Sequence, residues 1–201
     1  MTWITPFHQD SDFRWPLCLD DKVLIFEERI SGWQLEIADA CINGGQPAMR
    51  LSGWAVLMII FSYFELIGKL RVGNEGKQES KSCFRRGLED VFLGLSNLPA
   101  KYQEEVVTIL YTSGRCGFYH SGMAQQRIII SGEYSASIAH SPAGVVLINP
   151  HLLVPQLKEH LQRYVAELRD PANQGARQNF EKHFDYLHAL DPLGRSKKKN
   201  V

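Results

Sequence analysis

The chain has no net charge, because 22 aspartates and glutamates balance its 22 lysines and arginines. Without excess positive charge, it has no long-range field to attract nucleic acid or an anionic membrane surface, so any site for a polyanion must be local. It also lacks paired cysteines: the four present are scattered, with no C-x-x-C spacing. That pattern argues against a zinc site and favours the reduced thiols of a cytoplasmic protein.

No hydrophobic run is long enough to cross a bilayer. The most apolar stretch, Trp54 to Phe64, extends to about 14 mostly apolar residues before Lys69, whereas a spanning helix needs roughly 20. Residues 1–16 have neither the basic region nor the apolar region of a secretory signal. We therefore expect a cytoplasmic protein without membrane association, in which 54–64 is part of a buried core helix.

The pattern of apolar residues predicts a mainly helical domain. With 44% hydrophobic residues in a length of 201, the chain can build a sizeable core. Apolar side chains recur at three- and four-residue steps, which is typical of amphipathic helices. Four such segments joined by short loops favour an antiparallel bundle. They cover residues 20–41, about 47–72, 84–95 and 99–115.

The period changes after Gly122. Two β-branched runs, 127–130 and 144–148, are bounded by glycine and proline and predict a small β-hairpin or ribbon at about 126–149. Two more helical patterns follow it, around 157–168 and 180–187.

The expected organisation is one domain with short appendages. It consists of an irregular amino-terminal arm (1–20), a single helical domain (21–195) and a disordered tail (196–201). We expect the arm's aromatic side chains to pack on the core or on a second subunit; they are Trp3, Phe7, Phe13 and Trp15.

One short segment carries residues with plausible catalytic chemistry. Arg115 and His120 lie five residues apart, and an imidazole can move protons near neutral pH while a guanidinium grips phosphate oxygens. With 12 arginines and 7 histidines, chance alone could produce one such pair, so its surroundings matter. Gly114, Gly117 and Gly122 weaken a regular helix here. Because five residues of an ideal helix rotate a side chain by about 140°, the pair shares a face only if the helix is distorted or the arginine reaches around it.

An arginine followed after four residues by a histidine, behind a helical bundle, resembles the HEPN domains. These are small all-α proteins of prokaryotic toxin–antitoxin, phage-defence and CRISPR systems, many of them metal-independent ribonucleases. The resemblance covers roughly residues 20–125. It implies a homodimer, and an antitoxin or another defence-system protein as partner. Cys116 follows the arginine, where HEPN nucleases commonly carry a polar residue.

The resemblance also implies roles for individual residues. His120 would act as base or acid on the RNA 2′-hydroxyl and the leaving oxygen, and Arg115 would hold the phosphate, giving 2′,3′-cyclic phosphate and 5′-hydroxyl ends. No metal or cofactor is expected. Glu65 lies in an apolar run, so its carboxylate either pairs with a cation, for which Arg115 is a candidate, or points to solvent. Cys116 is another supporting candidate, and so is Tyr119, whose ring could stack on bases. Arg85, Arg86 and Arg127 could contact phosphates.

Two other interpretations remain open. The bundle could be a non-catalytic dimeric scaffold that binds a protein partner, or Arg115 could clamp the phosphate of a nucleotide or signalling molecule. A second arginine–histidine pair, Arg177 and His183 with the spacing R-x5-H, looks like a solvated helix face, with Phe180 and Phe184 on its core side. The remaining histidines have no metal-ligand spacing.

Overall fold

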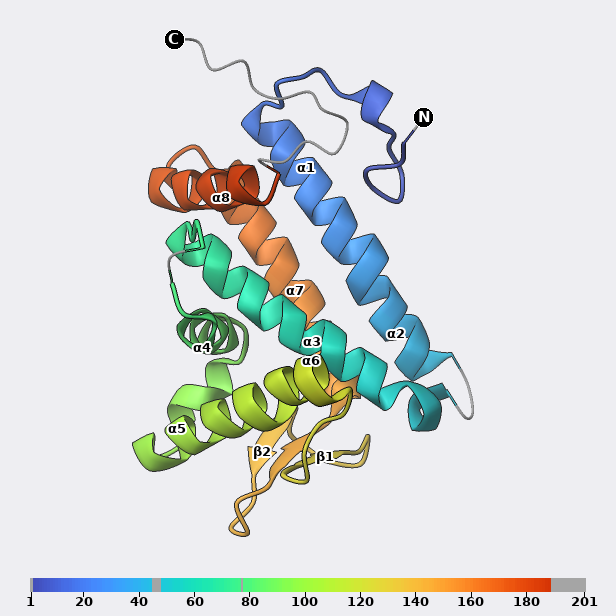
Figure 1. Ribbon diagram of the computed structural model, residues 1–201, viewed down its shortest axis with the longest axis vertical. Coiled ribbons are helices and arrows are strands. Elements are labelled where there is room, and N and C mark those ends of the chain that lie inside the picture. The colour runs from blue at the N-terminus through green and yellow to red at the C-terminus, as the bar shows by residue number, and fades with distance from the viewer. Residues whose placement is uncertain (1, 45–47, 77, 189–201) are drawn as a thin grey trace.

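The computed structural model describes residues 2–44, 48–76 and 78–188, which form a mainly helical protein with a small three-stranded sheet (Figure 1). The first predicted helix forms in two parts, α1 (Leu19–Ile30) and α2 (Glu36–Asn43), joined without a break by a π-helical segment, Ser31–Leu35. Cys18 caps its start: the Sγ atom accepts a hydrogen bond from the Asp21 amide, and the Asp21 carboxylate accepts one from the Cys18 amide.

The other predicted helices also form, with shifted boundaries. The bounds are α3 (Ala48–Val72), α4 (Ser80–Val91), α5 (Ala100–Ile109), α6 (Gly117–Ser121), α7 (Pro150–Arg169) and α8 (Gln174–Leu187). Helix α7 begins earlier than predicted because Asn149 caps it, accepting a hydrogen bond from the His151 amide, and Pro150 fits the first helical position. Figure 1 shows α3 at the centre, between α1 and α2 on one side and α4 on the other.

Helix α3 is the central helix, as its apolar sequence predicts. Its fully buried side chains belong to the core that α3 forms with α2, α4, α7 and α8; they are Val56, Leu57, Ile60, Phe61, Tyr63, Phe64, Ile67 and Leu70. Trp54 and Met58, one helical turn apart, are nevertheless about half exposed, at 46% and 48%. Within the described residues, no helix combines the length and the apolar character that a membrane crossing requires.

The predicted hairpin is wrong in its pairing. The two predicted strands exist, as β1 (Ile128–Ile130) and β3 (Val146–Ile148), but they run parallel, with Ile129 opposite Leu147. A third strand, β2 (Ile138–His140), pairs antiparallel with the other edge of β3, giving the order β1-β3-β2. The sequence did not reveal β2, because it is only three residues long and contains a single β-branched residue.

Polar contacts join the amino-terminal arm to α1. The Glu28 carboxylate of α1 accepts hydrogen bonds from Thr5 and His8, at 2.6 and 2.8 Å. The Arg29 guanidinium donates to the carbonyl oxygen of Ile4. Of the four aromatic residues expected to pack, Phe13 lies against the core, while three remain exposed in the single chain: Trp3, Phe7 and Trp15. Their packing on a second subunit stays a prediction. The tail at 196–201 lies outside the described residues.

Candidate functional site

The predicted distortion of the motif helix is confirmed. Helix α5, a π-helical segment at Leu110–Cys116 and α6 form one uninterrupted rod, and the π-helical segment carries Arg115. Glycine is required at two positions. A Cβ atom on Gly114 would lie 2.4 Å from the Phe61 ring of α3, and one on Gly117 would lie 2.8 Å from the carbonyl oxygen of Met123. The glycines therefore let α3 and the loop after α6 approach this rod closely.

Arg115 is held by an ion pair with Glu65, and this predicted contact is confirmed. The Arg115 Nε atom lies 2.6 Å from Oε2, and Nη2 lies 3.2 Å from Oε1. Lys69, one turn along α3, approaches Glu65 Oε1 at 2.6 Å. Burial of Glu65 opposes its ionisation, but hydrogen bonds from Lys69 and Arg115 outweigh this and lower its pKa. The cluster of two cations and one carboxylate keeps a net positive charge.

Aromatic rings support the same guanidinium. The Arg115 Cζ atom lies 4.3 Å from the centre of the Tyr119 ring, one turn later, and 5.9 Å from that of Tyr111. Cys116 is half-buried and contacts both Arg115 and Tyr111; burial and this thiol raise the pKa of Tyr111. Tyr119 is 65% exposed, so one edge of the stacked pair faces solvent.

His120 lies apart from this cluster. It is exposed near the end of α6, which Gly122 terminates in the left-handed conformation (φ 69°). Within the described residues, no hydrogen bond or ion pair joins His120 to another side chain. The structure thus brings Arg115 together with Glu65, Cys116 and Tyr119, and places His120 next in the chain after the stacked Tyr119.

The three arginines expected to contact RNA lie on other elements than the motif. Arg127 precedes β1, where its Nη2 atom lies 2.6 Å from Glu105 and its Nε atom donates to the carbonyl oxygen of Gly144. Arg85 and Arg86 lie on α4, where Arg85 forms ion pairs with Glu104 of α5 and with Glu89.

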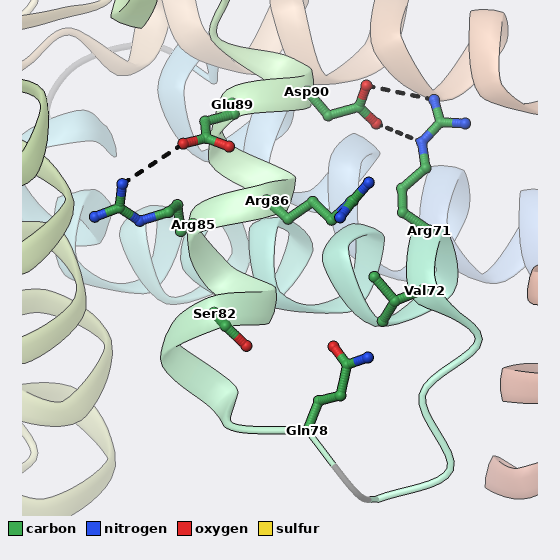
Figure 2. A pocket seen from close by; sticks show the side chains of 8 residues that line it. All are labelled: Arg71, Val72, Gln78, Ser82, Arg85, Arg86, Glu89 and Asp90. Atoms are coloured by element: carbon green, nitrogen blue, oxygen red, sulfur yellow. Dashed lines mark hydrogen bonds and ion pairs between the residues drawn. The ribbon is translucent and has the colours of Figure 1, made fainter.

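A pocket of about 670 Å³ opens between the end of α3 and the outer face of α4 (Figure 2). We call it the α3–α4 pocket. Three arginines, two carboxylates and a hydroxyl line much of it: Arg71, Arg85, Arg86, Glu89, Asp90 and Ser82.

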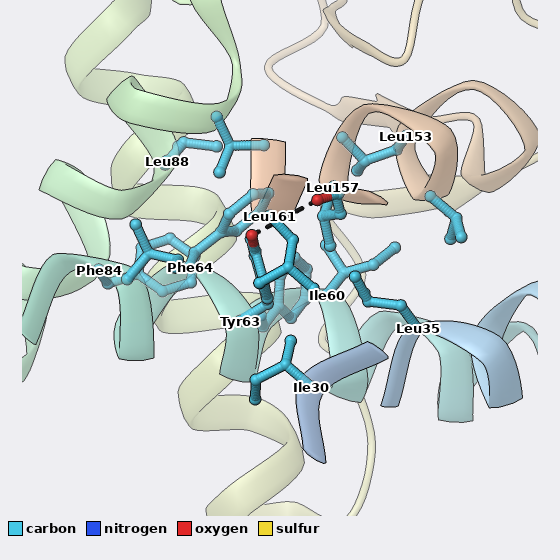
Figure 3. Packing of buried hydrophobic residues seen from close by; sticks show 14 of the residues in the cluster. Ile30, Leu35, Ile60, Tyr63, Phe64, Phe84, Leu88, Leu153, Leu157 and Leu161 are labelled. Atoms are coloured by element: carbon cyan, nitrogen blue, oxygen red, sulfur yellow. Dashed lines mark hydrogen bonds between the residues drawn. The ribbon is translucent and has the colours of Figure 1, made fainter. Parts of the chain in front are cut away.

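A partly buried polar network lies beside this pocket and reaches two buried side chains, Tyr63 and His160. The Asp90 carboxylate can only accept hydrogen bonds, so His160 Nε2 donates to it at 3.0 Å, and His160 Nδ1 lies within hydrogen-bond distance of the Tyr63 hydroxyl oxygen, at 2.8 Å. Figure 3 shows the Tyr63 hydroxyl directed towards α7 from among apolar side chains of the core, with Leu157 beside it. Asp90 also accepts from Arg71 at 2.7 Å, and Arg71 donates to both oxygens of Glu167.

The sequence interpretation missed this network. Its members come from α3, α4 and α7, so no local spacing connects them. One signal was present: His160 lies three residues after Leu157 and one before Leu161, both core residues, which places an imidazole on the buried face of α7. A buried imidazole needs hydrogen-bond partners, and Tyr63 and Asp90 supply them.

Arg177 and His183, the R-x5-H pair, form hydrogen bonds to backbone carbonyl groups. Phe180 and Phe184 lie in the core, as predicted, but His183 is also buried, so the view of this helix face as solvated is wrong for that residue. Its Nδ1 atom donates to the carbonyl oxygen of Asn74, and burial lowers its pKa. Arg177 donates to the carbonyl oxygen of Leu168. In the parts of the chain that the structure describes, no three His, Cys, Asp or Glu side chains are grouped to hold a metal ion.

Comparisons of the chain with protein-family models, with curated proteins and with solved structures give no match.

Proposed function

We propose that the protein is a metal-independent endoribonuclease of the HEPN type, acting in toxin–antitoxin or phage defence. One observation carries the proposal: the Arg115 guanidinium is fixed by Glu65 and Tyr119 within a net positive cluster, on the same helical rod as the exposed His120. A fixed guanidinium favours phosphate binding because its orientation costs no further entropy.

The proposed chemistry uses groups that the chain and its substrate supply. The ion pair with Glu65 occupies two N–H groups of Arg115, and an arginine has five, which leaves donors for phosphate oxygens. His120 takes the proton of the RNA 2′-hydroxyl, and the resulting alkoxide attacks phosphorus. A protonated imidazole then gives its proton to the departing 5′-oxygen, leaving a 2′,3′-cyclic phosphate and a 5′-hydroxyl.

Two proton transfers require two acid–base groups, and a homodimer would supply the second His120. The exposed Trp54 and Met58 favour an interface beside the motif, because Trp54 contacts Phe118 of α6, with ring centres 5.3 Å apart. Sedimentation analysis tests this. We expect Met58→Asp to dissociate the dimer, and Trp33→Ala, which changes an equally exposed tryptophan of the first helical rod, to leave it intact.

The enzyme test is RNA cleavage in EDTA, with analysis of the product ends. We expect His120→Ala to lower the rate at least 100-fold, because acid–base groups contribute typically 10²–10⁴-fold. Arg115→Lys, which keeps the charge but loses the fork, should lower it about tenfold or more. His151→Ala, a change at a half-buried histidine on α7, is the matched control. Equal cleavage by the His120→Ala and wild-type proteins would reject the proposal.

The second candidate is a non-catalytic dimeric module. It is favoured by the Glu65 carboxylate, which already neutralises much of the charge that Arg115 would offer to phosphate. Absence of cleavage by a wild-type dimer, combined with retention of the dimer in His120→Ala, would support this candidate.

A further inference from the structure

The α3–α4 pocket contains one arginine without an anionic partner. Its other two arginines are neutralised: Arg85 pairs with Glu89 at 3.8 Å and with Glu104, and Arg71 pairs with Asp90 at 2.7 Å and with Glu167 (Figure 2). Arg86 lies between these two pairs, is exposed, and has no hydrogen bond or ion pair to any residue that the structure describes. Its five N–H donors are therefore open to an anion entering the pocket.

The volume of the pocket and its two carboxylates restrict which anions can bind there. At about 670 Å³, the pocket is within the range of small-molecule sites, roughly 300–1,000 Å³, and exceeds what a single oxyanion fills. The carboxylates of Glu89 and Asp90 would repel a second anionic group, but they accept hydrogen bonds from hydroxyls. The residues that line the pocket therefore suit a ligand with a single phosphate group, for Arg86, and with hydroxyl groups, for the carboxylates.

We propose that the α3–α4 pocket binds the phosphate monoester of a small phosphorylated sugar or nucleotide, with Arg86 as its phosphate ligand. The Ser82 hydroxyl and the Gln78 amide, on the same wall, supply further hydrogen-bonding groups. This site contains neither Arg115 nor His120, so ligand binding here can be tested independently of ribonuclease activity.

Occupation of the pocket would stabilise the fold. Arg71 and Asp90 line the pocket and also belong to the polar network that joins α3, α4 and α7. A ligand that binds only the folded protein raises its melting temperature, by an amount that depends on ligand concentration.

Isothermal titration calorimetry of the full chain tests the proposal with AMP, ribose 5-phosphate, adenosine and inorganic phosphate. We expect at least one of the two phosphate esters to bind and adenosine to bind more weakly; whichever ester binds identifies the source of the phosphate. Arg86→Ala should lower that affinity about tenfold or more, since a bidentate arginine–phosphate pair is lost. Because Arg86 has no described partner, this variant should fold normally. Arg163→Ala, which changes an exposed arginine of α7, is the control.

Three results would overturn the proposal. They are no binding of either ester, equal binding by Arg86→Ala and wild type, and adenosine binding as tightly as AMP. An RNA oligonucleotide serves as the last arm: if Arg86→Ala weakens RNA binding and leaves AMP binding unchanged, Arg86 is an RNA contact instead.

Discussion

The buried Glu65 carboxylate holds the Arg115 side chain in place. Its side chain is only 7% exposed, so its charge is stable only because Arg115 and Lys69 both contact it. The same contacts orient the guanidinium, which links the stability of the core helix to the geometry of the motif. A change at Arg115 therefore affects folding as well as any activity.

We expect Arg115→Ala to lower the free energy of unfolding by about 1–3 kcal/mol, because Lys69 is then the one cation left beside Glu65 among the described residues. Adding Glu65→Gln to this variant should restore part of the loss, since a neutral amide needs no counter-charge. Urea denaturation at pH 7 measures both. Arg163→Ala, whose ion pair with Glu159 is exposed on both sides, should change stability by less than about 0.5 kcal/mol. If Arg115→Ala lost as little unfolding free energy as Arg163→Ala, the stabilising role of the Glu65–Arg115 pair would be contradicted.

Helices α3 and α4 touch along their backbones, because each has a glycine where the other passes. A Cβ atom on Gly68 would lie 1.7 Å from the carbonyl oxygen of Cys83, and one on Gly87 would lie 1.8 Å from that of Phe64. Neither neighbour is a flexible side-chain end that could move aside. This close crossing places Arg71 next to Asp90 and so forms one wall of the α3–α4 pocket.

Gly87→Ala should therefore destabilise the protein by about 3 kcal/mol, because its methyl group forces the two backbones apart. Gly175→Ala is the matched control: it also lies in a helix, but a Cβ atom there meets nothing within 4 Å. We expect the control to be neutral or to stabilise by up to about 1 kcal/mol. Thermal unfolding measures the melting temperatures of the two variants. Equal melting temperatures would refute the close crossing.

The network of Tyr63, His160, Asp90, Arg71 and Glu167 holds three helices together across the fold. Burial of Asp90 opposes its ionisation, but hydrogen bonds from His160 and Arg71 outweigh this and lower its pKa to about 2. Unfolding exposes the carboxyl, and its pKa returns to about 3.8. The unfolded chain then binds the proton more readily than the folded protein does, so acid favours unfolding.

The stabilisation by Asp90 should be complete above about pH 4 and should disappear as the pH falls towards 2. Denaturation curves of wild type and Asp90→Asn, measured from pH 7 to pH 2, check this. The variant should be less stable by about 1–3 kcal/mol at pH 7, and the difference should shrink across the acid range. Glu133→Gln, at an exposed loop position, should follow the wild-type curve. A difference that does not change with pH would disprove the ionic role.

The sequence predicts those features that depend on neighbours along the chain. The periodic apolar residues of α3 and the glycines around Arg115 are local signals, and the central helix and the helix distortion are both observed. The Glu65–Arg115 contact was one of two outcomes that the sequence allowed, because a carboxylate in an apolar run either pairs with a cation or points to solvent. The parallel pairing of β1 with β3 was not, since strand direction is decided by the path of the chain between them. The buried position of His183 also depends on which face of α8 meets the loop after α3.

The π-helical segment at Leu110–Cys116 has a consequence for how this region can change in evolution. A turn with i to i+5 hydrogen bonds holds one residue more than a turn of α-helix, so it corresponds to a single-residue insertion in an otherwise regular rod. Deleting one residue there would restore α-helical geometry and turn everything beyond it by about 100° relative to α5. The orientation of His120 relative to the rest of the bundle is therefore more sensitive to length variation at this turn than to most side-chain replacements nearby.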